Sequence, residues 1–146
     1  MNDNKINFKT PRTKVGTMVE IAVVALILIM WGLIIHWMKS ATPDDTKILI
    51  ITGAEGTIIP AGMLALCYFP KTFNFPSKIE PKPIHYLLSI HLIRLTSIYV
   101  ILIHITSIWS IARPNNAIAS KATMVLCGML VVTAILYLIY FYRKFE

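Results

Sequence analysis

The sequence predicts an all-α, polytopic membrane protein with four transmembrane helices and both termini in the cytoplasm. Hydrophobic residues make up 56% of the chain and charged residues 14%, whereas soluble domains have about 45–50% and about 25%. Four apolar runs, at about 18–37, 48–69, 90–111 and 122–142, each approach the roughly 20 residues that cross a hydrocarbon core. Four runs are too few for a closed barrel, so the spans must be helical and the 146 residues form a single membrane domain, a four-helix bundle.

The elements follow in order along the chain. The run 18–37 is too long for a signal-peptide core and has no small-residue cleavage site behind it, so we interpret it as a retained anchor. Pro43-Asp44-Asp45 indicates a turn or helix start before the run 48–69. The segment 70–83 contains four prolines and is predicted to be a stiff cytoplasmic strap on the inner membrane surface. Residues 84–89 either begin the third span early or lie in the interface.

Basic residues predict the orientation. Nine of them fall in the N-terminal tail, the strap and the C-terminus, and four fall in the two other loops. The positive-inside rule therefore places both termini and the strap in the cytoplasm. The net charge of +7 is explained by short segments that flank the spans, where anionic lipid headgroups are the nearest partner. We expect the lipid bilayer, and no nucleic acid, as the partner of these charges.

The strap carries a family resemblance. It reads FPKTFNFPSKI over residues 69–79, and Arg94 follows in the next span. This pattern resembles a family of small bacterial membrane proteins called "domain of unknown function 1648", whose strap after the second span is of the F-N-aromatic-P-x-K-I type. The matching residues are Phe73, Asn74, Phe75, Pro76, Lys78 and Ile79.

The resemblance implies a four-helix protein of the bacterial plasma membrane. The same domain occurs in the immunity protein of the sporulation-delaying toxin system, which protects the toxin's producer and takes part in signalling. Members of the family usually carry a P-x-H-F-N type motif between the first two spans, and here that loop has only Pro43-Asp44-Asp45. The resemblance therefore implies architecture and location more than an activity tied to that histidine.

Ionisable residues inside spans are candidates for a functional site. Glu55 lies in the second span and Arg94 in the third, while Glu20 lies near the inner end of the first span and competes for the same arginine. A charge in hydrocarbon is costly unless it is paired, protonated or wetted. We expect a structural pair of Arg94 with either acid, with Glu55 fastening the second span to the third. The alternative is a transport or proton-relay role.

Small residues surround Glu55. Gly53 and Gly56, with threonines four residues away, predict close helix approach, and Pro60 predicts a kink because it cannot donate its backbone bond. The alternative is a broken helix that lines a site. Two histidines at similar predicted depth, His36 and His104, are weak candidates for a bis-histidine haem. The residues show no nucleophile–base motif, phosphate loop or zinc ligand spacing.

These observations predict a non-enzymatic membrane protein that uses no cofactor and acts by interaction. It would be an immunity-like or signalling component, or an accessory subunit of a larger complex, with a protein partner or with copies of itself. Two alternatives stay open. One is a small ion-coupled transporter using Glu55, Pro60 and Arg94, and the other is a haem-binding redox subunit using His36 and His104.

Overall fold

The structure is a computed structural model that describes residues 9–73, 75 and 82–145. All regular structure in these residues is helical: α1 (Lys14–Met38), α2 (Pro43–Leu66), the short 3-10 helix η1 (Pro70–Thr72), α3 (Pro83–Ala112) and α4 (Ala117–Phe145). The four α-helices are each long and apolar enough to cross a membrane. The predicted all-helical architecture, with four helices long and apolar enough to cross a membrane, is confirmed.

Local chemistry explains where the helices begin. The Thr13 side chain accepts a hydrogen bond of 3.0 Å from the backbone N–H of Gly16 and caps α1. Thr42 caps α2 in the same way, with Pro43 in the first turn. Pro83 is the first residue of α3. Its pyrrolidine ring fixes its own φ angle at a value that suits a helix. Residues 84–89 are therefore helical and continuous with the third apolar run.

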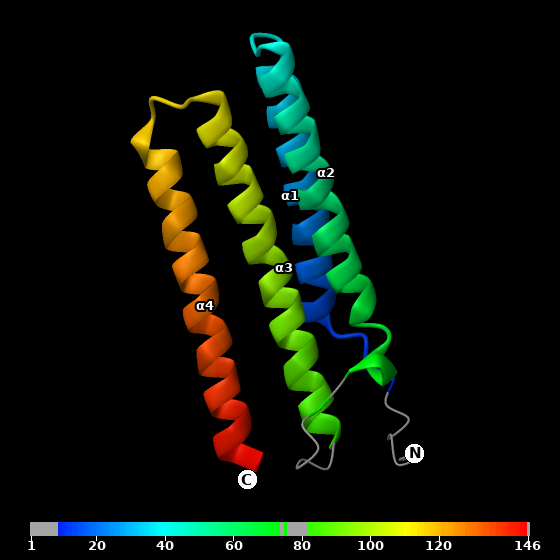
Figure 1. Cartoon of the computed structure of the whole chain (residues 1–146). Coiled ribbons are helices and arrows are strands. Elements are labelled where there is room, and N and C mark those ends of the chain that lie inside the picture. The colour runs from blue at the N-terminus through cyan, green and yellow to red at the C-terminus, as the bar shows by residue number, and fades with distance from the viewer. Residues whose placement is uncertain (1–8, 74, 76–81, 146) are drawn as a thin grey trace.

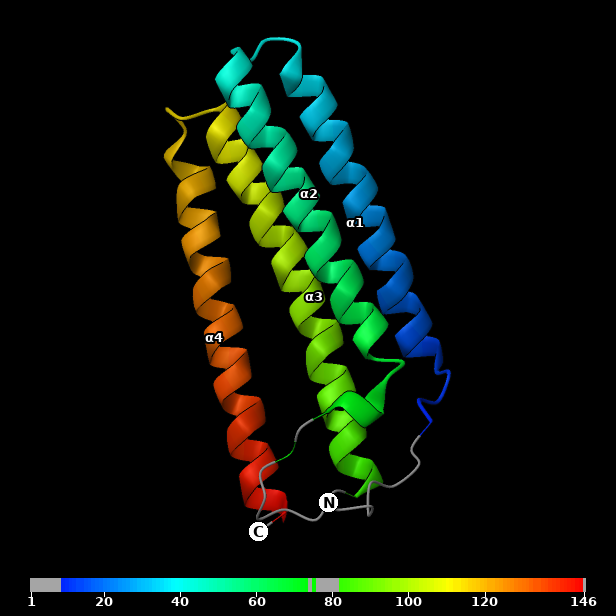
Figure 2. The same cartoon turned by 45° about the vertical axis from the view of Figure 1, so that its right-hand side comes forward.

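α3 is the central helix of the arrangement. It packs against α1, α2 and α4, whereas α4 makes extensive contact with α3 alone. Figures 1 and 2 show α1 and α2 along one side of α3 and α4 along the other. The predicted four-helix bundle is thus a three-helix core with a flanking fourth helix. We call the end that carries η1, the start of α1 and the end of α4 the strap end.

The core lies between α1, α2 and α3, toward the end opposite the strap. Met30, Ile34, Leu49 and Ile108 are almost completely buried and form one apolar cluster. Many large apolar side chains of α1, α2 and α4 are exposed, whereas in α3 Ile84 is the one large apolar residue that is exposed. Exposed apolar faces of this kind are typical of helices that meet lipid. An apolar side chain gains little free energy when it moves from lipid into the protein, so it can stay on the outer face.

Candidate functional site

Two neighbouring groups of residues at the strap end could carry a function. One is an ion pair between α1 and α3. The other is an aromatic cluster that joins the strap to α3 and α4. The geometry of each decides whether it can receive a ligand.

The ion pair joins α1 to α3. Nη2 of Arg94 lies 3.5 Å from Oε1 of Glu20, and the side chains are 6% and 30% exposed. The hydroxyl of Tyr68, just beyond α2, donates a hydrogen bond to the same carboxylate oxygen. This bond raises the pKa of the Tyr68 phenol, with a smaller contribution from burial. One carboxylate therefore links three segments of the chain.

Gly16 explains why Arg94 pairs with Glu20. A Cβ atom at position 16 would lie 2.6–2.7 Å from three guanidinium atoms of Arg94, so the guanidinium rests directly on the α1 backbone. Glu20 is one turn further along the same face. Among the described residues no hydrogen-bond partner reaches the buried Nε of Arg94.

The space beside Arg94 is small. A hollow bordered by Thr13, Ile90, His91 and Arg94 has a volume of about 10 Å³, which is about the space of a single water molecule. The Thr10 hydroxyl donates a hydrogen bond to the Cys67 carbonyl and ties the entry segment to the end of α2. A site of this size holds helices in register and has no room for a larger ligand.

Glu55 does not pair with Arg94, which corrects the prediction that it fastens the second span to the third. It is exposed, and no hydrogen bond or ion pair joins it to any described residue. The buried face of α2 carries Gly53, Gly56 and Pro60, and successive helical residues are 100° apart. Glu55 therefore points outward although its sequence neighbour packs inward. The three residues of the predicted ion-coupled site, Glu55, Pro60 and Arg94, do not meet.

α2 approaches α1 and α3 closely at Gly53 and Gly56, as predicted. A Cβ atom at Gly53 would collide with Ile34 Cδ1, and one at Gly56 would lie 2.8 Å from Met30 Sδ and 3.0 Å from His104 Cβ. α2 remains one continuous helix through Pro60. Beside these glycines, Trp31 Nε1 donates to the Thr57 hydroxyl at 2.9 Å, and that hydroxyl donates to the Gly53 carbonyl at 2.8 Å.

The histidines proposed for haem are not brought together. His36 is exposed, on the side of α1 away from its buried residues Met30 and Ile34. His104 packs against Gly56 and hydrogen-bonds through Nδ1 to the Val100 carbonyl at 2.7 Å. The described residues contain no group of three or more His, Cys, Asp or Glu side chains that could hold a metal ion.

The aromatic cluster is formed by the strap and two helix ends. Phe75 lies edge-on to Tyr86 of α3 at a ring-centroid distance of 4.9 Å and stacks on Phe141 of α4 at 6.1 Å. Phe73 stacks on Tyr86 at 6.3 Å. The other strap residues that carry the resemblance lie outside the described residues: Asn74, Pro76, Lys78 and Ile79.

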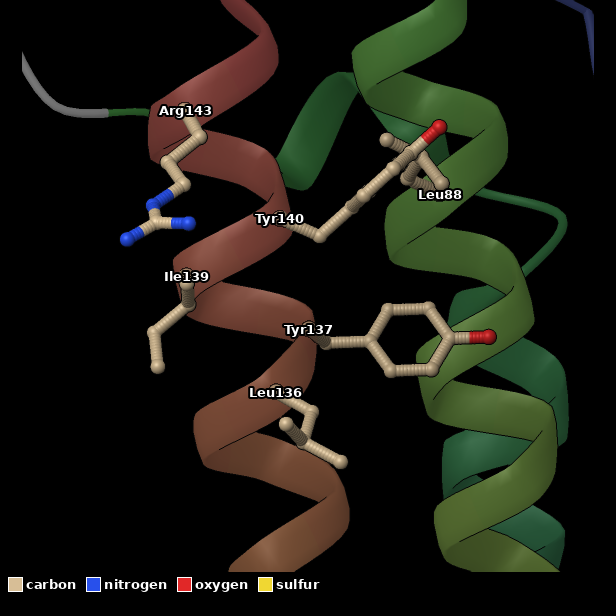
Figure 3. Close-up of a pocket in the computed structure, with 6 residues that line it drawn as sticks. All are labelled: Leu88, Leu136, Tyr137, Ile139, Tyr140 and Arg143. Carbon is tan, nitrogen blue, oxygen red and sulfur yellow. The ribbon is translucent and has the colours of Figure 1, made fainter.

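A pocket and a groove adjoin this cluster. The pocket has a volume of about 300 Å³, and its walls include Phe73, Phe75 and Phe141. The groove has a volume of about 760 Å³ and runs along α3 and α4. Leu88 and Tyr137 line both, so the two spaces are adjacent. Figure 3 shows Tyr137 and Tyr140 extending from α4 toward α3.

Sequence reasoning missed the α4 side of this site. Tyr137 and Phe141 are four residues apart and therefore share one face of α4. That spacing was a usable signal, but it does not stand out in a helix that is apolar on every side. Comparison with protein families, with curated proteins and with solved structures finds no match to this chain.

Proposed function

We propose that this chain is a non-enzymatic, multi-pass protein of the bacterial plasma membrane that binds an apolar helical segment of another protein. The observation that carries the proposal is the apolar groove between α3 and α4, which adjoins the pocket lined by the strap rings Phe73 and Phe75. The chain would act as an immunity-like or signalling component, or as an accessory subunit of a membrane complex.

The chemistry of the groove defines its occupant. Leu88, Leu136, Tyr137 and Ile139 supply apolar walls, and a peptide segment at membrane depth must be helical to satisfy its backbone. Aromatic and apolar side chains of such a helix would enter the pocket beside Phe75. Arg143 at the strap end of the groove favours an acidic side chain or a terminal carboxylate on the occupant.

The strap supplies the link to immunity. Its residues resemble those of a family that includes an immunity protein against a secreted peptide toxin, and two of them, Phe73 and Phe75, line the pocket. In an immunity role the bound helix would be the membrane-inserted toxin. In an accessory role it would be a spanning helix of the partner subunit. Both termini and the strap would face the cytoplasm, because basic residues concentrate at that end.

Site-specific photocrosslinking in native membranes tests the proposal. A photoreactive phenylalanine analogue replaces Leu88 in the groove, and in the matched control it replaces Ile29, a 54% exposed residue of α1. We expect a defined protein adduct from position 88 and none from position 29. A second variant, Tyr137→Ala, should weaken the adduct by removing one wall. Adducts with lipid only, or the same adducts from both positions, would contradict the proposal.

A further inference from the structure

A hollow lies at the end opposite the strap, between the end of α1 and the turn that joins α3 to α4. This turn is at the top of Figure 1. The hollow has a volume of about 760 Å³. It is lined by two tryptophans, Trp37 and Trp109, and by three polar residues of the turn, Arg113, Asn115 and Asn116. We call it the indole hollow.

Hydrogen bonds within the chain fix the turn that borders the indole hollow. The Arg113 N–H donates to the Trp109 carbonyl at 2.9 Å, and the Asn116 N–H donates to the Arg113 carbonyl at 2.9 Å. The Oδ1 atom of Asn116 accepts a bond of 3.0 Å from the Ile118 N–H. On the opposite wall, Trp37 packs against the buried apolar cluster of the core. Both walls are therefore held in place by the protein itself.

The polar groups of the indole hollow are donors without acceptors. No hydrogen bond or ion pair joins the side chain of Arg113 or Asn115 to any described residue. The carboxamide of Asn116 uses its oxygen as an acceptor, so both of its N–H groups remain available. The lining includes no Asp or Glu. The hollow therefore offers several donors and one positive charge to an acceptor from outside the chain.

The position of the tryptophans favours a lipid as the source of that acceptor. Trp37 is the last residue but one of α1, and Trp109 lies in the last turn of α3. Tryptophans at the ends of spanning helices lie at the level of the lipid headgroups. Phosphate groups occur at this level, and the guanidinium of Arg113 matches two phosphate oxygens at once. A soluble anion would leave the indole walls without a role.

The charges of the lining select among phospholipids. A zwitterionic headgroup brings an ammonium group close to Arg113, where like charges repel and no carboxylate of the lining receives it. A headgroup with hydroxyl groups has no such conflict, because Asn115 and Asn116 can bond to hydroxyls. The lining therefore favours a headgroup whose one charge is the phosphate.

We propose that the indole hollow binds an anionic phospholipid with a hydroxylated, cation-free headgroup, as in phosphatidylglycerol. Arg113 donates to the phosphate oxygens, the carboxamides of Asn115 and Asn116 donate to the headgroup, and the two indoles pack against the start of the acyl chains. The lipid fills the space between α1 and the start of α4, a helix that makes extensive contact with α3 alone. The proposed function does not enter this inference, because the α3–α4 groove has other lining residues.

Photolabelling with lipid in vesicles tests the site. The full chain is placed in phosphatidylcholine vesicles that contain a photoreactive phosphatidylglycerol, and the labelled peptides are mapped by mass spectrometry. We expect labelling of residues 109–117, several-fold above that from a photoreactive phosphatidylcholine at the same concentration. Equal labelling of this segment by the two lipids would overturn the proposal. Because labelling is mapped to a segment, lipid bound to basic residues at the strap end does not count.

A charge-matched pair of variants tests the role of Arg113. Arg113→Gln should lower the labelling of residues 109–117 several-fold. Lys47→Gln is the control, since this exposed lysine near the start of α2 lies at the same end but not in the lining. It should label like the wild type. Equal labelling of the two variants would refute the site, and circular dichroism verifies that both keep the fold.

Inorganic phosphate distinguishes a lipid site from a site for a soluble anion. Added in excess to the vesicles, phosphate should leave the labelling of residues 109–117 at the level found with chloride of the same ionic strength, because it has no acyl chains to contact the indoles. Loss of labelling with phosphate alone would assign the hollow to a soluble anion and overturn the proposal.

Discussion

The guanidinium of Arg94 rests on the backbone of Gly16, so any side chain at position 16 would occupy the space that the arginine fills. This contact brings α3 against the start of α1 and sets Arg94 beside Glu20. The charged group is thereby held between the helices at the strap end, where the Arg94 side chain is 6% exposed. Five measurements test this arrangement and the contacts around it.

Gly16→Ala should lower stability because the new methyl group displaces the guanidinium from Glu20. We expect a loss of about 1 kcal/mol. The matched control is Gly32→Ala in the same helix, where a Cβ atom would meet nothing within 4 Å. That control should be neutral or slightly stabilising. Thermal unfolding in detergent, followed by labelling of the buried Cys67 thiol in a Cys127→Ser background, measures both variants.

Glu20→Gln should destabilise the protein by about 2 kcal/mol, because it leaves the buried guanidinium of Arg94 without its counter-charge. Adding Arg94→Met should recover part of this loss, since the two residues interact directly. Glu55→Gln is the control and should leave the unfolding temperature of the monomer unchanged. An equal loss in the Glu20 and Glu55 variants would show that Arg94 does not select Glu20.

The hydrogen bond of Tyr68 should make the stability of the fold depend on pH in the alkaline range. Its pKa is raised by the hydrogen bond to Glu20, so the neutral phenol is favoured in the folded state. The stabilisation is fully present below the ordinary tyrosine pKa of about 10 and is lost as the pH rises through the raised pKa. Unfolding temperatures measured across this range should therefore fall further for the wild type than for Tyr68→Phe. Parallel curves would contradict the contact.

Thr57→Val should weaken the contact between α1 and α2 by about 1 kcal/mol, because the indole N–H of Trp31 loses its acceptor. Thr52→Val is a close control, since the Thr52 hydroxyl bonds within its own helix, to the Ile48 carbonyl at 2.8 Å. Tryptophan fluorescence and thermal unfolding should both change in the first variant and stay near wild type in the second. Similar shifts in the two variants would indicate a general effect of valine.

Phe75→Ala should detach the strap from α3 and α4, because it removes the ring that contacts both Tyr86 and Phe141. We expect a loss of about 2 kcal/mol and faster cleavage of the strap by protease. Phe69→Ala is the control, as this ring is 62% exposed. If the strap of Phe75→Ala were cleaved no faster than that of Phe69→Ala, the cluster would not hold it in place.

Residues of the two sites show how far sequence reasoning reached. Close helix approach was predicted at Gly53 and Gly56 because each has a threonine four residues away, and small residues at this spacing let two helices pack closely. The partner of Arg94 stayed open between two acids, and the role assigned to Glu55 was wrong. Both acids sit in apolar surroundings, and the rotation of a helix about its own axis cannot be deduced from surroundings that are apolar on every side.

The sequence by itself determined the number and approximate limits of the spanning helices, since hydropathy and length are properties of each segment alone. Pro83, which the sequence analysis placed at the end of the strap, is the first residue of α3. Only the tertiary structure decided that Arg94 meets Glu20, that Phe75 meets Phe141 and that Glu55 faces outward. These relations depend on which face each helix turns toward its neighbours. In helices that are apolar on every side, small residues and side-chain packing determine which face meets a neighbouring helix, and an apolar stripe does not.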